Sequence, residues 1–271
     1  MIKEYNKYNS GITMLAFCSA FTQFMMSEPD TAMFPKERIC GIVISCLISF
    51  LLALIINIIN FKINIFRYIA LSMIFFRLVY MVYRYVQYYQ TFYGSGSAGI
   101  ILLTITVAAL LIVYKNTAAA PIYDFFLISN ILMILALIIM SAGRLNAANI
   151  YSLYIINNDC LDTASVFFDV FTIAVFAADK KDRVYMQKNF LLAVLFAFTG
   201  ITLLQGLCIK GNLLYSLSPL QALVQIFSGE VVKRYDYFFA IMFTVNYFGA
   251  IMLYVLAAIK LTDKEKAVEK N

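Results

Sequence analysis

One arginine lies in the middle of a long apolar run. Arg77 follows Arg67 by ten residues, so in a helix it lies about 15 Å further along the axis, near the centre of a hydrocarbon core about 30 Å thick. Placing an arginine at that depth raises the free energy of membrane insertion by at least roughly 2.5–3.5 kcal/mol. Its guanidinium is therefore expected to face protein or water and to have a partner. Tyr80 shares its helix face, whereas Arg84 can extend to the outer interface.

Asp169 is the best candidate partner for Arg77. It lies in a second apolar run, residues 163–178, at a comparable depth. The pair could join two helices as a purely structural contact. Alternatively, it could bind a zwitterionic ligand, with Arg77 taking a carboxylate and Asp169 taking an ammonium group. The sequence leaves both interpretations open.

The remaining residues do not provide the motifs of the common catalytic and metal-binding sites. The chain has no histidine, and its five cysteines are scattered without a C-x-x-C spacing. This excludes the common zinc sites, Ser–His–Asp triads and haem ligation by histidine. Neither a Walker loop nor a GxGxxG fingerprint occurs. We therefore expect no enzyme activity, no cofactor and no metal. The net charge of +6 is typical of the cytoplasmic Lys/Arg bias of membrane proteins and does not predict nucleic-acid binding.

Composition indicates a polytopic α-helical membrane protein. Apolar residues make up 63% and charged residues 13% of the 271 residues, against about half and about a quarter in soluble domains. The apolar runs are close to the roughly 20 residues that cross a bilayer, and they must be helices because lipid satisfies no backbone hydrogen bonds. We predict one all-α integral membrane domain with about eight transmembrane helices, near residues 11–26, 39–61, 65–89, 99–114, 122–141, 163–178, 189–208 and 237–259.

Two further segments flank the last predicted span. Residues 218–228 begin with Ser218-Pro219, a helix-start signal, and carry apolar residues on one face, which predicts a short interfacial helix. Residues 260–271 are charged and are predicted to form a solvated tail.

Polar residues and glycines within the spans are expected to serve helix packing. Isolated amides in membrane helices usually bond to a neighbouring helix, and glycines let helices approach closely. The residues concerned are Gln23, Asn57, Asn130, Gln205 and Asn246, and Gly200, Gly206 and Gly249.

Lysine and arginine counts predict the orientation. Of the 21 basic residues, Arg77 and Arg84 lie deep within the third span, and thirteen, including Arg67 near the start of that span, fall on the side of the N-terminus. Cytoplasmic loops carry the excess of Lys and Arg, so both termini are predicted to be cytoplasmic. The remaining six, on the outer side, are Lys36, Arg38, Arg144, Lys210, Lys233 and Arg234.

Three segments carry a resemblance to a known family. They are residues 214–223 with Ser218-Pro219, the turn Val232-Lys233-Arg234-Tyr235-Asp236, and the basic stretch Asp179-Lys180-Lys181-Asp182-Arg183. Together with a proline-bearing loop after the first helix, they resemble the spore germination family of membrane subunits, the B component of nutrient germinant receptors. That family is similar to the amino acid/polyamine/organocation transporters.

The resemblance implies a fold and a site. Such transporters have two inverted repeats of five helices, with the first and sixth helices broken around the ligand. Carried over, this implies a truncated inverted-repeat fold, since only eight spans are predicted, with a ligand between the first and sixth helices. The candidate ligand-binding residues are then Ser19, Gln23, Ser165, Asp169, Arg77 and Tyr80. The glycines usual in the family's first helix are absent from residues 16–23.

The functions expected from this resemblance fall into three classes. The first is a membrane subunit of a spore germination nutrient receptor that senses a small nutrient such as an amino acid. The second is a secondary amino-acid transporter, and the third is a structural membrane subunit without a ligand. The expected partners are the lipid bilayer, the small nutrient and the other receptor subunits, and the expected location is the bacterial plasma membrane.

Overall fold

The structure is an all-helical bundle. It is a computed structural model that describes residues 2–26, 35–58, 64–93, 99, 106, 119–141, 163–177, 180–208 and 235–268. Over these residues it contains helices and no strand. The helices are α1 (Ile2–Met26), α2 (Pro35–Ile56), α3 (Asn64–Tyr93), α5 (Ala119–Ser141), α6 (Thr163–Phe176), α7 (Lys180–Cys208) and α9 (Tyr235–Val268).

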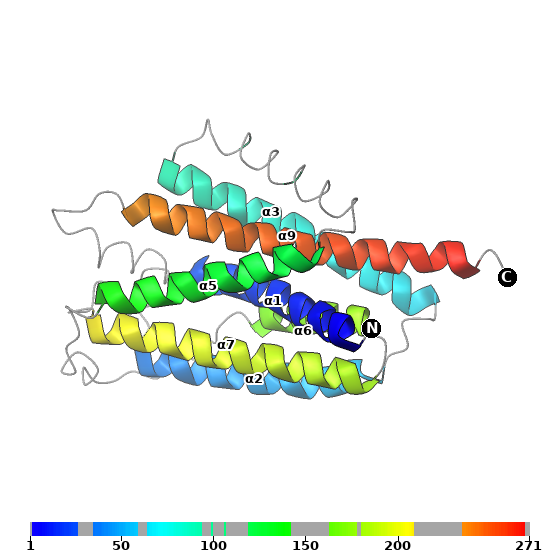
Figure 1. Ribbon diagram of the computed structural model, residues 1–271. Helices are drawn as coiled ribbons and strands as arrows, with labels where there is room; N and C mark the ends of the chain where they lie inside the picture. Colours follow the sequence, from blue (N-terminus) through cyan, green and yellow to red (C-terminus); the bar gives the residue numbers. More distant parts are fainter. Residues whose placement is uncertain are drawn as a thin grey trace.

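The helices are arranged around α1. Helix α1 contacts α5, α6, α7 and α9, while α3 lies along α9 and α2 lies along α7. Figure 1 shows the α3–α9 pair on one side of α1 and the α2–α7 pair on the other, with the start of α1 and the end of α9 at the same end of the bundle.

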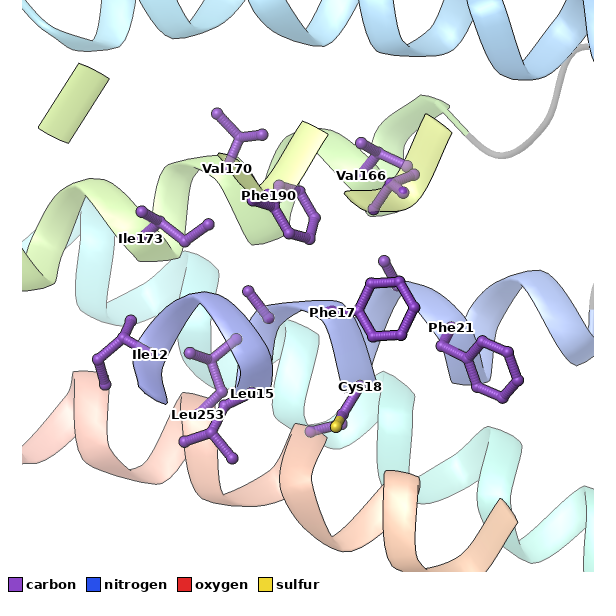
Figure 2. Close-up of a cluster of buried hydrophobic side chains, with 14 of the residues drawn as sticks. Ile12, Leu15, Phe17, Cys18, Phe21, Val166, Val170, Ile173, Phe190 and Leu253 are labelled. Atoms are coloured by element: carbon purple, nitrogen blue, oxygen red, sulfur yellow. The ribbon is translucent and has the colours of Figure 1, made fainter. Parts of the chain in front are cut away.

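Helices α1 and α6 form the interior of the bundle. Every described side chain from Leu15 to Met25 in α1, and from Asp169 to Ala177 in α6 and just beyond it, is buried. In Figure 2, Phe17 points from α1 toward α6, whereas Leu15 and Cys18 point toward α9. A helix that is apolar and buried all round belongs in the core of a large bundle.

The outer helices divide into a buried and an exposed face. On α2 the buried face carries small residues, Ser45, Ser49 and Ala53, which allow close packing on α6 and α7. The opposite face exposes large apolar side chains such as Leu47 and Leu51. In a bilayer these side chains contact acyl chains, which are as apolar as leucine.

Four of the described helices are long and apolar enough to cross a membrane. The stretches are Arg38–Ile56, Ile65–Gln87, Lys180–Cys208 and Phe243–Thr262. Shorter apolar stretches occur at Asp124–Ile139 and Val166–Phe176. The predicted fourth span, residues 99–114 (apart from Gly99 and Thr106), and the interfacial helix 218–228 lie outside the described residues.

Several helix ends differ from the predicted spans. Helix α1 begins at Ile2, α7 begins at Lys180 and α9 continues to Val268, so the basic stretch 179–183 largely belongs to α7 and most of the predicted tail is helical. Hydropathy locates the part of a helix that fits the hydrocarbon core. Charged residues such as Lys and Glu continue a helix readily in the wet interface, so the helices extend beyond it.

The predicted second span ends early. Residues 39–61 were expected to be continuous, but α2 ends at Ile56 and Asn57–Ile58 form a turn. Arg183 Nη1 donates to the Ile56 carbonyl at 3.4 Å, and Asn57 Nδ2 donates to Gln187 Oε1 at 3.0 Å. Side chains from α7 therefore stabilise this helix end, whose last carbonyls have no partner within the helix.

The C-terminal end of α6 is stabilised in a similar way, by a side chain from α9. Lys260 Nζ donates to the Phe176 carbonyl at 2.6 Å and lies 5.4 Å from the centre of the Phe176 ring. A cation at a helix C-terminus interacts favourably with the helix dipole. Lys260, predicted as the first residue of the solvated tail, therefore joins α9 to α6.

Gly249 allows α9 to approach α1 and α5 closely. A Cβ atom at this position would lie 3.0 Å from Cys18 Cβ and 3.1 Å from Phe126 Cε1. The predicted role of Gly249 in close packing is therefore confirmed. At Gly200 the same prediction is wrong, because a Cβ atom there meets nothing within 4 Å.

Substitution of these two glycines by valine will have different effects. Gly249→Val overpacks the contact between α1, α5 and α9 and should destabilise the protein by about 1–3 kcal/mol. Gly200→Val adds a side chain to open space and should change stability little. Thermal unfolding of the purified protein in detergent measures both, at roughly 2–4 °C per kcal/mol. Equal melting temperatures for the two variants would contradict the close approach at Gly249.

Candidate functional site

Four buried side chains from four helices meet in the middle of the bundle. We call Ser19 of α1, Arg77 of α3, Asp169 of α6 and Tyr254 of α9 the polar centre. All four are buried, with Arg77 5% exposed and the others 0%. Arg77 and Tyr254 lie near the midpoints of the apolar stretches Ile65–Gln87 and Phe243–Thr262, so the polar centre lies where a bilayer is most apolar.

Hydrogen bonds connect the four residues. Ser19 Oγ donates to Asp169 Oδ1 at 2.7 Å, and the Tyr254 hydroxyl donates to the same oxygen. The Tyr254 hydroxyl accepts from Arg77 Nε at 3.3 Å and lies 3.1 Å from Ser19 Oγ. Tyr254 therefore bridges the guanidinium of Arg77 and the carboxylate of Asp169, and charge-assisted bonds of this kind are stronger than neutral ones.

Two aromatic rings also lie close to Arg77. Its Cζ atom lies 5.5 Å from the centre of the Tyr80 ring and 5.6 Å from the centre of the Phe168 ring. Aromatic faces attract a guanidinium at such distances, most strongly where water is excluded. These rings and the Tyr254 hydroxyl explain how an arginine is accommodated at this depth.

The structure brings together three of the six candidate site residues in the polar centre, Ser19, Arg77 and Asp169, and places Tyr80 beside it. Gln23 lies one helical turn from Ser19, and its amide nitrogen contacts Met81 Sδ on α3, so it borders the polar centre. Ser165 lies in the first turn of α6, and its side chain is outside the described residues.

Sequence reasoning missed Tyr254 and Phe168. Tyrosine is enriched at membrane interfaces, so the tyrosines other than Tyr80 were given no individual role. The available signal was position: Tyr254 falls near the middle of an apolar stretch, where a hydroxyl needs a hydrogen-bond partner. Phe168 precedes Asp169 directly and had no signal of its own.

Two other polar residues of the predicted spans, Asn57 and Asn130, make different kinds of contact. Asn57 bonds Gln187 across α2 and α7, which confirms an interhelical contact. Asn130 Nδ2 donates mainly within its own helix, to the Phe126 carbonyl at 2.9 Å, and reaches Cys18 Sγ on α1 at 3.6 Å. Hydrogen bonds to the backbone of the preceding turn are common for polar side chains inside helices.

Comparison with known proteins gives no family for this chain: no family model, no curated protein and no solved structure matches it.

Proposed function

We propose that this chain is the membrane subunit of a spore germination nutrient receptor, and that its polar centre senses a small nutrient such as an amino acid. One observation carries the proposal: a cationic and an anionic side chain meet, through Tyr254, at mid-membrane depth. Ionisable groups inside a membrane are costly and usually mark a functional site. The resemblance in residues 179–183, 214–223 and 232–236 supplies the class of protein.

A zwitterionic ligand matches the charges of the polar centre. Its ammonium group would bind the Asp169 carboxylate, and its carboxylate would bind Arg77. The Tyr254 hydroxyl now bridges these two groups, so the ligand would replace that bridge with two direct ion pairs. Since the groups belong to α1, α3, α6 and α9, this exchange changes the contacts between the interior helices and the α3–α9 pair. Such a ligand shifts the bundle by as much as its affinities for the two arrangements differ.

Arg77→Leu tests this proposal in spores. The variant should abolish the response to the nutrient because leucine binds no carboxylate. The protein should still reach the membrane, although it is less stable because the charge of Asp169 is no longer balanced by Arg77. Arg84→Leu, two turns away on α3 and outside the polar centre, is the matched control and should respond normally. A normal response of Arg77→Leu would remove this residue from the ligand site.

Secondary amino-acid transport is the second candidate function. It is favoured by the burial of α1 and α6, the helices that surround the ligand in the transporters that the chain resembles. With about eight spans, the proposed fold is a truncated form of that inverted repeat. Uptake of labelled amino acids into proteoliposomes is the measurement, and no uptake across a broad panel would exclude this function.

A structural subunit without a ligand is the third candidate. It is favoured by the burial of the polar centre, whose four residues are bonded to one another. This alternative predicts that no small solute raises the melting temperature of the purified protein, whereas a receptor or transporter is stabilised by its ligand in proportion to occupancy.

The proposed orientation has both termini in the cytoplasm of a bacterial cell, in its plasma membrane. It predicts that Cys40, an exposed residue near the start of α2, faces the outside. With Cys160 and Cys208, which this orientation also predicts on the outer side, replaced by serine, a membrane-impermeant maleimide should label intact cells at Cys40. The further change Cys40→Ser should abolish that labelling. Lys181→Cys in the Cys40→Ser background, at the start of α7, should be labelled only after permeabilisation. The reverse pattern would mean that the protein has the opposite orientation.

A further inference from the structure

A cavity lies away from the polar centre. It has a volume of about 630 Å³ and lies between α1, α5 and α7, and we call it the side groove. Its lining contains none of the four residues of the polar centre. Its size falls within the roughly 300–1,000 Å³ of sites that bind small molecules.

The side groove is polar at one end and apolar at the other. Polar side chains line it near the starts of the three helices, namely Asn9 and Thr13 of α1, Asp124 of α5, and Tyr185 and Asn189 of α7. Further along the same helices the lining is apolar apart from Asn130 of α5, and its apolar residues are Phe17, Leu127, Ile131, Ile134, Phe196 and Ala197. This order matches an amphiphile with its head group at the membrane interface and its chain directed inward.

The groove opens sideways, on the outer surface of the bundle. Phe196 is 73% exposed and Ile131 is 49% exposed, although both line the groove. In a membrane this surface meets lipid. An occupant can therefore enter from the bilayer.

The charge and hydrogen-bonding groups of the lining select the head group. Among the described residues that line the groove, Asp124 is acidic and none is basic. Asn9 and Asn189 also line it, and each has a side-chain carbonyl oxygen that accepts hydrogen bonds. The occupant that suits this lining carries a positive charge and N–H donors.

We infer that the side groove binds one membrane lipid whose head group carries a primary amine. The amine lies at the end formed by Asn9, Asp124 and Asn189, and an acyl chain lies along Leu127, Ile131 and Phe196. This site is separate from the proposed nutrient site and does not depend on it.

Lipid-dependent thermal unfolding tests this inference. The protein is purified in detergent, stripped of lipid and melted with phosphatidylethanolamine, phosphatidylcholine or phosphatidylglycerol of the same acyl chains. Phosphatidylethanolamine should raise the melting temperature by about 5 °C at saturation. Phosphatidylcholine, which has the charge but no N–H donor, should raise it less, and the anionic lipid least. Equal or greater stabilisation by phosphatidylglycerol, or none by any lipid, would overturn the inference.

Two tryptophan variants locate the effect. Ala193→Trp puts a ring into the side groove and should remove the phosphatidylethanolamine shift. Ile128→Trp puts the same ring on an exposed position of α5 that does not line the groove, and it should keep the shift. An unchanged shift in Ala193→Trp would show that the lipid does not bind in the side groove. So would native mass spectrometry that shows a dimer of the unaltered protein which Ala193→Trp dissociates, because a second copy would then occupy the groove.

Discussion

Asp169→Leu will destabilise the protein by about 3–5 kcal/mol, because it removes the carboxylate and leaves the guanidinium of Arg77 buried with its charge uncompensated. Arg77→Met will do the same from the opposite side. At roughly 2–4 °C per kcal/mol, each single variant should melt about 10 °C below the unaltered protein in detergent. The rings of Tyr80 and Phe168 lie 5.5 Å and 5.6 Å from Arg77 and offset only part of this loss.

The double variant Arg77→Met/Asp169→Leu separates structure from function. Replacing two buried opposite charges by apolar residues of similar volume is often neutral or stabilising, so the double variant should be more stable than either single variant. It should nevertheless fail to respond to the nutrient. Losses that simply add in the double variant would show that the two residues are not coupled. A restored response would mean that the polar centre is a structural contact and does not sense the nutrient.

Tyr254→Phe will lower the free energy of unfolding by about 3 kcal/mol, the second largest effect that we expect from a single substitution. The hydroxyl accepts from Arg77 and donates to Asp169, and a hydrogen bond to a charged group contributes about 1.5–3 kcal/mol. Phenylalanine preserves the ring and its packing, so the loss reports on the bridge itself. The measurement is the melting temperature of the purified protein.

Tyr247→Phe is the matched control for this prediction. Tyr247 lies two turns before Tyr254 on α9 and is equally buried, and its hydroxyl accepts from the neutral backbone N–H of Tyr85 at 3.0 Å. Its loss should cost about 1 kcal/mol. If the two variants melt at the same temperature, the Tyr254 hydroxyl does not connect two charged groups.

The polar centre could be predicted in part from the sequence. Charged residues in an apolar run can be recognised without a structure. Arg77 and Asp169 were therefore identified from the free-energy cost of a charge in the membrane and from their predicted depth in it. The bridge could not be predicted in the same way. A tyrosine in a membrane helix can lie at the interface, face lipid or point inward, and only the packing of α9 on α3 and α1 brings the Tyr254 hydroxyl between the two charges.

The arrangement of the helices was less predictable than their existence. Apolar residues that face lipid and apolar residues that face protein have the same hydropathy, so the burial of α1 and α6 could not be distinguished from the half-exposed faces of α2. The helix ends were also misplaced, because charged residues at the start of α7 and the end of α9 continue the helices outside the apolar core.

Equilibrium binding of labelled amino acids to the purified protein tests the central claim most directly. At least one amino acid should bind to the unaltered protein, with affinity lost when either its amino or its carboxyl group is blocked. The double variant Arg77→Met/Asp169→Leu should remain folded and bind none. Binding that persists in this variant, or no binding across a complete panel, would contradict the claim that the polar centre is a nutrient site.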